Sequence, residues 1–217
     1  RGRLRQEAEA YNRSLEPWQL QTVPTREEHR RYSALLNLSS SGIMGYLEIP
    51  DIQVELPICH GIDPAVLQAG VGHLEGSALP VGGPDTHCVL TGHRGLPSAR
   101  LLTDLDQLAE GDLFFLHVLG ETMAYEVDQI LVVEPDDFRS LTPLPGQDLC
   151  TLLTCTPYGV NSHRLLVRGR RTALPETPAS WPRAEAQRLD SAFGILAAGP
   201  ALLLWLWTEH RRAKRHK

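Results

Sequence analysis

The sequence has little of several features that would point to particular classes of protein. Its four cysteines, Cys59, Cys88, Cys150 and Cys155, do not have the spacing of a dense disulfide framework. A formal net charge of -5 gives no electrostatic reason to expect a nucleic-acid partner. No internal repeat or low-complexity tract is present. A length of 217 residues fits one domain with appendages, long enough to bury a proper core.

One long run without charge, AFGILAAGPALLLWLW, lies at residues 192–207, and a basic tail follows it. As a helix, this run would span roughly 24 Å, a little less than the ~30 Å hydrocarbon core of a bilayer. We expect a transmembrane helix over residues 191–208, with residues 209–217 cytoplasmic and everything upstream outside the cell. The alternative is a buried or interfacial C-terminal helix. The proline-rich residues 174–190 are expected to be a linker.

The N-terminal residues 1–40 have the pattern of two helices separated by a proline-braced segment. RQEAEAYNRSL contains good helix formers, and TREEHRRYSALLNL begins with a capping box formed by Thr25 and Glu28. Between them, LEPWQLQTVP carries Pro17 and Pro24, so this segment is not helical throughout.

Residues 41–173 change to short runs of strand type, separated by glycine, proline and aspartate. Two short helices are expected among them, one at Asp63-Pro64 and one over SARLLTDLDQLA. Many short strands with few helices favour a closed barrel or a sandwich. The candidate strands are GYLEIP, IQVELPI, THCVLTG, DLFFLHV, MAYEVDQILVVE, DLCTLLTC and HRLLVRG.

Three residues at strand ends could form a catalytic group. Cys155 ends the apolar run TLLTC, and Arg164 opens the next run, HRLLVRG. A cysteine nucleophile needs a base or acid partner, usually histidine. Of the nine histidines, His93 stands at the end of an apolar strand in LTGHRG, where a side chain projects onto a rim. The alternative is that Cys155 is an inert core thiol, as most free cysteines are.

A metal site or a cofactor is not expected. His87 and Cys88 are adjacent and close to His93, but no second pair of ligands follows at the spacing of a zinc finger.

The order TGHRG, TLLTC and HRLLVRG resembles the sortases, cysteine transpeptidases of the Gram-positive cell surface. The stretches GYLEIP, VGHLEGSALPVGG, DQILVVEPDD and CTPYGVNSHRLLVRG resemble the class C, pilus-assembling branch, and the likeness covers roughly residues 45–171. It implies a mainly β fold: a closed sortase-type β-barrel at 41–173 with short helices, an N-terminal helical lid region and a C-terminal hydrophobic helix.

The resemblance also implies roles for the three residues. Cys155 is the nucleophile that attacks the Thr–Gly carbonyl of an LPxTG-like motif in a pilin precursor. His93 is the general acid and base, and Arg164 stabilises the oxyanion or the substrate. A pilin lysine amine then resolves the thioester, on the outer side of a Gram-positive cell membrane. One alternative is a housekeeping-type sortase that anchors proteins to peptidoglycan. Another is a non-catalytic surface-anchored β-barrel that acts as a binding module.

Class C sortases carry an N-terminal lid in which an aspartate and a proline precede an aromatic residue. Glu16, Pro17 and Trp18 resemble that pattern, with glutamate in place of the usual aspartate. The resemblance implies that Trp18 covers the groove between Cys155 and His93 and that Glu16 pairs with Arg164. The alternative is that Trp18 only anchors the loop between two helices.

Overall fold

The computed structural model describes residues 1–16, 20, 22–37, 42–95 and 100–176. Pro17, Trp18, the expected membrane helix, the basic tail and most of the expected linker lie outside these residues. Within them, no helix is both long enough and apolar enough to cross a membrane. The chain divides into two units, residues 1–175 and 176–217. All the helices and strands with described bounds lie in the first unit.

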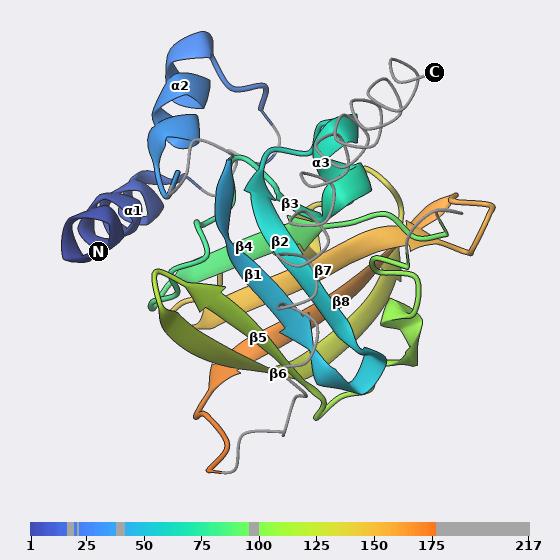
Figure 1. The fold of residues 1–217 in the computed structure, drawn as a ribbon. Coiled ribbons are helices and arrows are strands. Elements are labelled where there is room, and N and C mark those ends of the chain that lie inside the picture. Colours follow the sequence, from blue (N-terminus) through green and yellow to red (C-terminus); the bar gives the residue numbers. More distant parts are fainter. Residues whose placement is uncertain (17–19, 21, 38–41, 96–99, 177–217) are drawn as a thin grey trace, which may run out of the picture. The chain divides into compact units, whose positions relative to one another are not determined.

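Eight strands close into a barrel in the order β1-β2-β3-β4-β7-β8-β6-β5 (Figure 1). The β2–β3 and β4–β7 pairs are parallel, and the other pairs are antiparallel. The predicted mainly β fold and closed barrel are therefore confirmed. The strands are β1 Ile43–Ile49, β2 Val54–His60, β3 Val71–His73, β4 Thr86–Thr91, β5 Leu113–Val118, β6 Glu121–Val133, β7 Asp148–Thr156 and β8 His163–Thr172.

Short helical elements connect some of the strands. Helix α3 (Pro64–Ala69) lies where Asp63-Pro64 predicts it. The helix expected over SARLLTDLDQLA is wrong for the part that the structure describes, which has only the 3₁₀ turn η3 (Leu105–Gln107). Leu101 there has a φ of 41°, which a right-handed helix does not allow. Two further 3₁₀ turns are η2 (Pro50–Ile52) and η4 (Arg139–Leu141).

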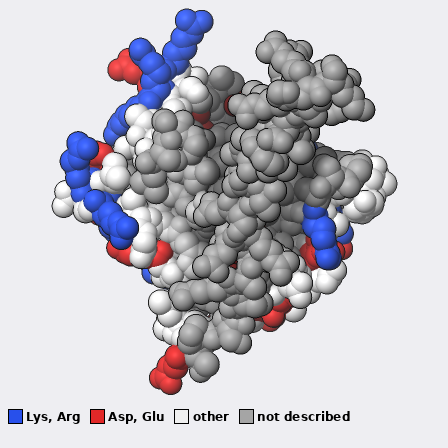
Figure 2. All heavy atoms as spheres, viewed as in Figure 1, with Lys and Arg blue, Asp and Glu red and all other residues white. Residues whose placement is uncertain are grey.

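Two N-terminal helices, α1 (Gly2–Ser14) and α2 (Arg26–Ala34), precede the barrel. The capping box of Thr25 and Glu28 is present at the start of α2. Both helices bury one side, since Tyr11 and Tyr32 belong to the same core cluster as the barrel interior. Their other side is charged, and in Figure 2 basic side chains gather over α1 and α2.

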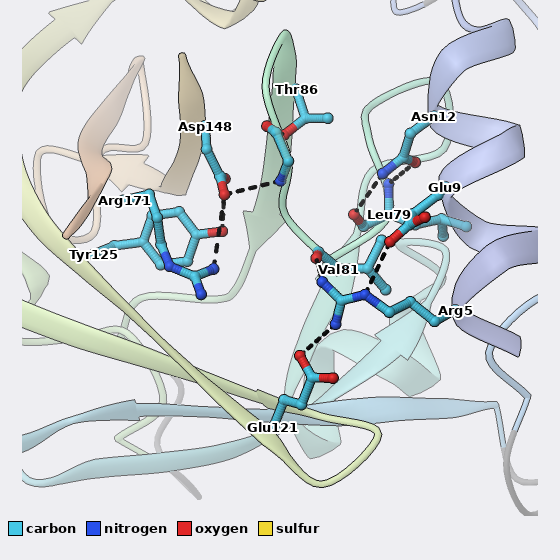
Figure 3. Close-up of polar contacts among 11 residues, drawn as sticks. Arg5, Glu9, Asn12, Leu79, Val81, Thr86, Glu121, Tyr125, Asp148 and Arg171 are labelled. Carbon is cyan, nitrogen blue, oxygen red and sulfur yellow. Dashed lines mark hydrogen bonds and ion pairs between the residues drawn. The ribbon is translucent and has the colours of Figure 1, made fainter. Parts of the chain in front are cut away.

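Polar contacts fix α1 to the barrel (Figure 3). The side-chain amide of Asn12 donates to the Leu79 carbonyl at 3.1 Å and accepts from the Leu79 amide at 2.7 Å. Arg5 donates to the Val81 carbonyl at 3.0 Å and forms an ion pair with Glu121. Because one side chain satisfies both polar groups of Leu79, the end of α1 has a defined place against the barrel.

Candidate active site

The parallel pairing of β4 with β7 brings His93 and Cys155 to neighbouring positions. Thr91 pairs with Leu153, and the Gly92 amide donates to the Leu153 carbonyl at 3.1 Å. One residue further, the Thr154 hydroxyl donates to the Gly92 carbonyl at 2.8 Å. His93 and Cys155 are the next residues on the two strands. They lie 62 positions apart in the chain. His93 directly follows Gly92, Cys155 directly follows Thr154, and Gly92 and Thr154 are hydrogen-bonded to each other.

Arg164 joins the same end of the sheet from the other side of β7. It is the direct partner of Cys155 in the antiparallel β7–β8 pair, so both side chains project to one face. Its Nη1 donates to the carbonyls of Asn161 and His163, at 3.2 and 3.0 Å. These bonds hold the guanidinium at the start of β8. The structure thus brings all three predicted site residues together at one end of β4, β7 and β8.

The strand period determines which face Cys155 presents. Thr154 is buried, together with the inward-facing Leu152 and Cys150. Because side chains alternate along a strand, Cys155 points outward with Leu153. Cys155 and His93 are only partly buried. Cys155 therefore stands on the outside of the barrel at a strand end, which is not the place of a core space-filler.

Two of the other cysteines, Cys59 and Cys150, have the environment of structural thiols. Cys88 and Cys150 pair directly across β4 and β7, with side chains 3% and 0% exposed. Burial raises the pKa of the Cys150 thiol well above its usual range, and it also raises the pKa of Cys59. Since the thiolate is the nucleophilic form, desolvation disfavours attack by either residue.

A second cluster of packed apolar residues lies on the outer face of the barrel, the face of β7 that carries Leu153 and Cys155. We call it the outer apolar cluster. It is separate from the barrel core and combines residues of β4, β6, β7 and β8 with residues of the loops and of the α1–α2 connection. Its members are buried Val89, Leu141 and Leu166 with partly buried Leu20, Leu74, Leu131, Val133, Phe138 and Leu153.

The other histidines of the barrel make contacts that account for them structurally. His73 is fully buried and bonds to the Tyr32 hydroxyl at 3.0 Å. His87 lies between the Thr142 carbonyl and the Thr151 hydroxyl. His117 contacts Glu48 at 2.7 Å. Among the described residues, no group of three or more histidine, cysteine or acidic side chains could hold a metal ion.

The predicted lid lies only in part among the described residues. Glu16 is exposed just after α1 and lines a pocket of about 240 Å³ with Leu20 and His87. His87 stands at the beginning of β4, whereas Arg164 lies beside the end of β7. The predicted pair between Glu16 and Arg164 stays a prediction. Leu20 packs on the outer apolar cluster.

The family model that matches this chain is the sortase domain, over residues 47–172. The chain belongs to the sortase family. The match includes His93, Cys155 and Arg164, and members of this family are cysteine transpeptidases. The predicted membership in this family is confirmed.

Individual sortases agree with the family match. Sortase D of Bacillus subtilis is 33% identical over 130 residues, covering 58% of this chain and 63% of the relative. Sortase A of Streptococcus agalactiae is 27% identical over 52% of this chain and 47% of that protein. The chain thus spans about half to two-thirds of the length of these curated relatives.

Solved structures of class C sortases are similar over most of the chain. Sortase C-1 from Actinomyces oris is 47% identical with a TM-score of 0.74, covering 80% of this chain and 98% of that one. Sortase C1 from Streptococcus agalactiae is 47% identical with a TM-score of 0.75, covering 80% and 90%. The predicted resemblance to the class C branch is confirmed at this level.

Proposed function

We propose that this sortase is a class C cysteine transpeptidase. It cleaves an LPxTG-like motif between threonine and glycine and joins the acyl group to a pilin lysine amine. The observation that carries the proposal is the outward-facing Cys155 beside the ends of β4 and β8, with His93 and Arg164 at the same edge. The class C neighbours support the choice of a pilin as the substrate.

The reaction follows from these three side chains. The Cys155 Sγ adds to the threonine carbonyl carbon, and Arg164 donates hydrogen bonds to the developing oxyanion or to the substrate backbone. The C–N bond to glycine then breaks, and His93 gives a proton to the leaving amine. The lysine amine adds to the thioester, the C–S bond breaks, and His93 takes the proton of the incoming amine. The thiolate is thereby restored.

Substitutions test this assignment directly. We expect Cys155→Ala to abolish the thioester with a sorting-motif peptide. We expect His93→Ala and Arg164→Ala each to reduce turnover by about 10²–10³, the usual cost of removing a stabilising donor. Cys59→Ala is the matched control, because Cys59 is also partly buried but lies on β2. Near-normal cleavage by Cys155→Ala would refute the assignment.

The product identifies the acceptor. Mass spectrometry after incubation with a pilin precursor should find an isopeptide bond between the threonine carboxyl group and a lysine. A product joined to a peptidoglycan amine would show a housekeeping-type sortase instead. Peptide binding without cleavage, together with slow alkylation of Cys155, would show a binding module.

Glu16, Pro17 and Trp18 are proposed as the lid. Two described features support it: Asn12 and Arg5 fix α1 to the barrel, and Leu20 packs on the outer apolar cluster. A similar solved structure is a lid mutant of sortase A from Corynebacterium diphtheriae. A segment tethered this way has a high effective concentration, so even weak docking excludes substrate from the site most of the time.

Opening the lid should therefore raise activity. We expect Trp18→Ala and Glu16→Ala to speed both peptide hydrolysis and Cys155 alkylation. Glu16→Asp, which has the carboxylate of the family's usual aspartate, should dock the lid where Glu16→Ala does not. Val23→Ala is the control from the same connection, since Val23 is 94% exposed. Rates equal to the parent in both assays would mean that Trp18 is not part of a lid.

We further propose that the chain is held in a Gram-positive cell membrane by residues 191–208, with the barrel outside. Sortases are generally enzymes of the Gram-positive cell surface. Protease added to protoplasts should then remove the barrel and spare a tag placed after Lys217. Loss of the tag under the same conditions would reverse the orientation, and release of the barrel by salt alone would indicate peripheral attachment.

A further inference from the structure

The side chain of Arg94, the residue after His93, is almost completely enclosed. It is 9% exposed, although arginine is ordinarily a surface residue. Its Nη1 donates to the Thr156 hydroxyl at 3.2 Å, and its Nη2 forms an ion pair with Asp106 in η3. Thr156 follows Cys155 directly. One guanidinium thus connects the neighbour of His93 with the neighbour of Cys155.

Before His93, two hydrogen bonds at Gly92 hold the chain against β7. Strand β4 ends at Thr91, and beyond it the Gly92 amide donates to the Leu153 carbonyl and the Gly92 carbonyl accepts from the Thr154 hydroxyl. Two hydrogen bonds of the following loop go to the segment before η3. The His93 carbonyl accepts from the Leu102 amide at 3.2 Å, and the Gly95 amide donates to the Thr103 hydroxyl at 3.1 Å. Among the residues of this loop that the structure describes, Arg94 has a side chain that bonds back to β7, at the Thr156 hydroxyl.

One nitrogen of the Arg94 guanidinium, Nε, is buried without a hydrogen-bond partner among the described residues. Leaving a buried donor unpaired costs free energy, and native structures contain few such groups. The planar fork of arginine can bond Thr156 and Asp106 at the same time, whereas lysine offers one point charge. The Arg94 side chain thus keeps its two contacts with Thr156 and Asp106 although its Nε has no hydrogen-bond partner among the described residues.

We propose that Arg94 is a positioning residue, which sets the separation of His93 and Cys155 by bridging Thr156 and Asp106. The inference rests on the proposed function, because it concerns how His93 transfers protons to and from groups at Cys155. Arg94 does not contact substrate in this proposal. A displacement of the acid–base group by about 1 Å is enough to lower turnover about 100-fold.

The test is steady-state cleavage of a sorting-motif peptide, together with the rate of Cys155 alkylation as a function of pH. We expect Arg94→Lys and Thr156→Val each to lower kcat by about 10- to 100-fold with KM unchanged. Both variants should also change the pH profile of alkylation, because the interaction of the thiol with His93 changes. Thr156→Ser keeps the hydroxyl and should restore kcat. Arg100→Ala is the matched control, since Arg100 is an exposed arginine paired with Asp104.

The double variant of Arg94→Lys and Thr156→Val should be no slower than the slower single variant, because both remove the same bridge. Parental kcat and an unchanged alkylation profile in Arg94→Lys and Thr156→Val would overturn the inference. An increase in KM alone would also overturn it, since Arg94 would then bind substrate. If the parent cleaves no peptide, the proposed function fails, and the alkylation profiles still decide whether Arg94 positions His93.

Discussion

Replacing Thr154 by valine removes one hydrogen bond at the junction of β4 and β7. The Thr154 side chain is 1% exposed, and its hydroxyl lies 2.8 Å from the Gly92 carbonyl oxygen. Valine has nearly the same shape but cannot donate. The substitution therefore leaves the Gly92 carbonyl without this partner in a site that water does not reach.

Two opposing contributions set the size of the effect. Leaving a buried acceptor unpaired costs about 1–3 kcal/mol. The additional buried methyl group contributes about 0.8 kcal/mol in the other direction. The net expectation is a loss of about 1 kcal/mol in the free energy of unfolding, within a range of about 0.2–2.2 kcal/mol. For a unit of this size, 1 kcal/mol corresponds to a decrease in Tm of roughly 2–4 °C.

The matched variant is Thr154→Ser, which keeps the hydroxyl and removes a buried methyl group at a cost of about 1 kcal/mol. Urea unfolding followed by circular dichroism gives the two stabilities, and peptide cleavage gives the activities. We expect similar losses of stability but a larger loss of kcat for valine, because only valine releases Gly92 and with it His93. Parental stability of Thr154→Val, or equal kcat values for valine and serine, would refute this reasoning.

Two further predictions concern the barrel. Burial lowers the pKa of His87 to about 4, from 6.5 when unfolded, so its stabilising neutral form is lost as the pH falls. Stability should be complete above pH 6.5 and decrease by about 3 kcal/mol toward pH 4. His87→Asn should flatten this dependence in urea unfolding, and an unchanged slope would exclude His87 as its cause. Asn12→Ala leaves the Leu79 amide unpaired, whereas the Leu79 carbonyl keeps its bond from the Val81 amide, and should cost about 1–3 kcal/mol. Hydrogen exchange should then accelerate in α1, whereas unchanged protection would mean that α1 is held by other contacts.

Much of the barrel is predictable because local patterns match its strands. Alternation of polar and apolar residues identifies most of the strands, and the capping box at Thr25 identifies the start of α2. The candidate site is also accessible from the sequence, because Cys155, His93 and Arg164 each stand at a strand end.

Other features depend on contacts that no local pattern contains. The parallel pairing of β4 with β7 joins segments separated by β5 and β6. The enclosure of Arg94 depends on Asp106, which the sequence suggests is part of a helix rather than the 3₁₀ turn that forms. The direct pairing of Cys88 with Cys150 likewise follows from the order of the strands and the register between β4 and β7.

The long sequence separation of His93 and Cys155 has a consequence for how the protein acquires reactivity. Contacts between distant segments are the slow ones to form during folding, because the intervening chain must first lose its freedom. Pairing of β4 with β7 closes a loop of chain that contains β5 and β6. A chain in which β4 and β7 have not yet paired thus carries the Cys155 thiol without His93 beside it. We expect the proposed activity to appear only once these two strands pair, so that acylation of Cys155 reports on that step of folding.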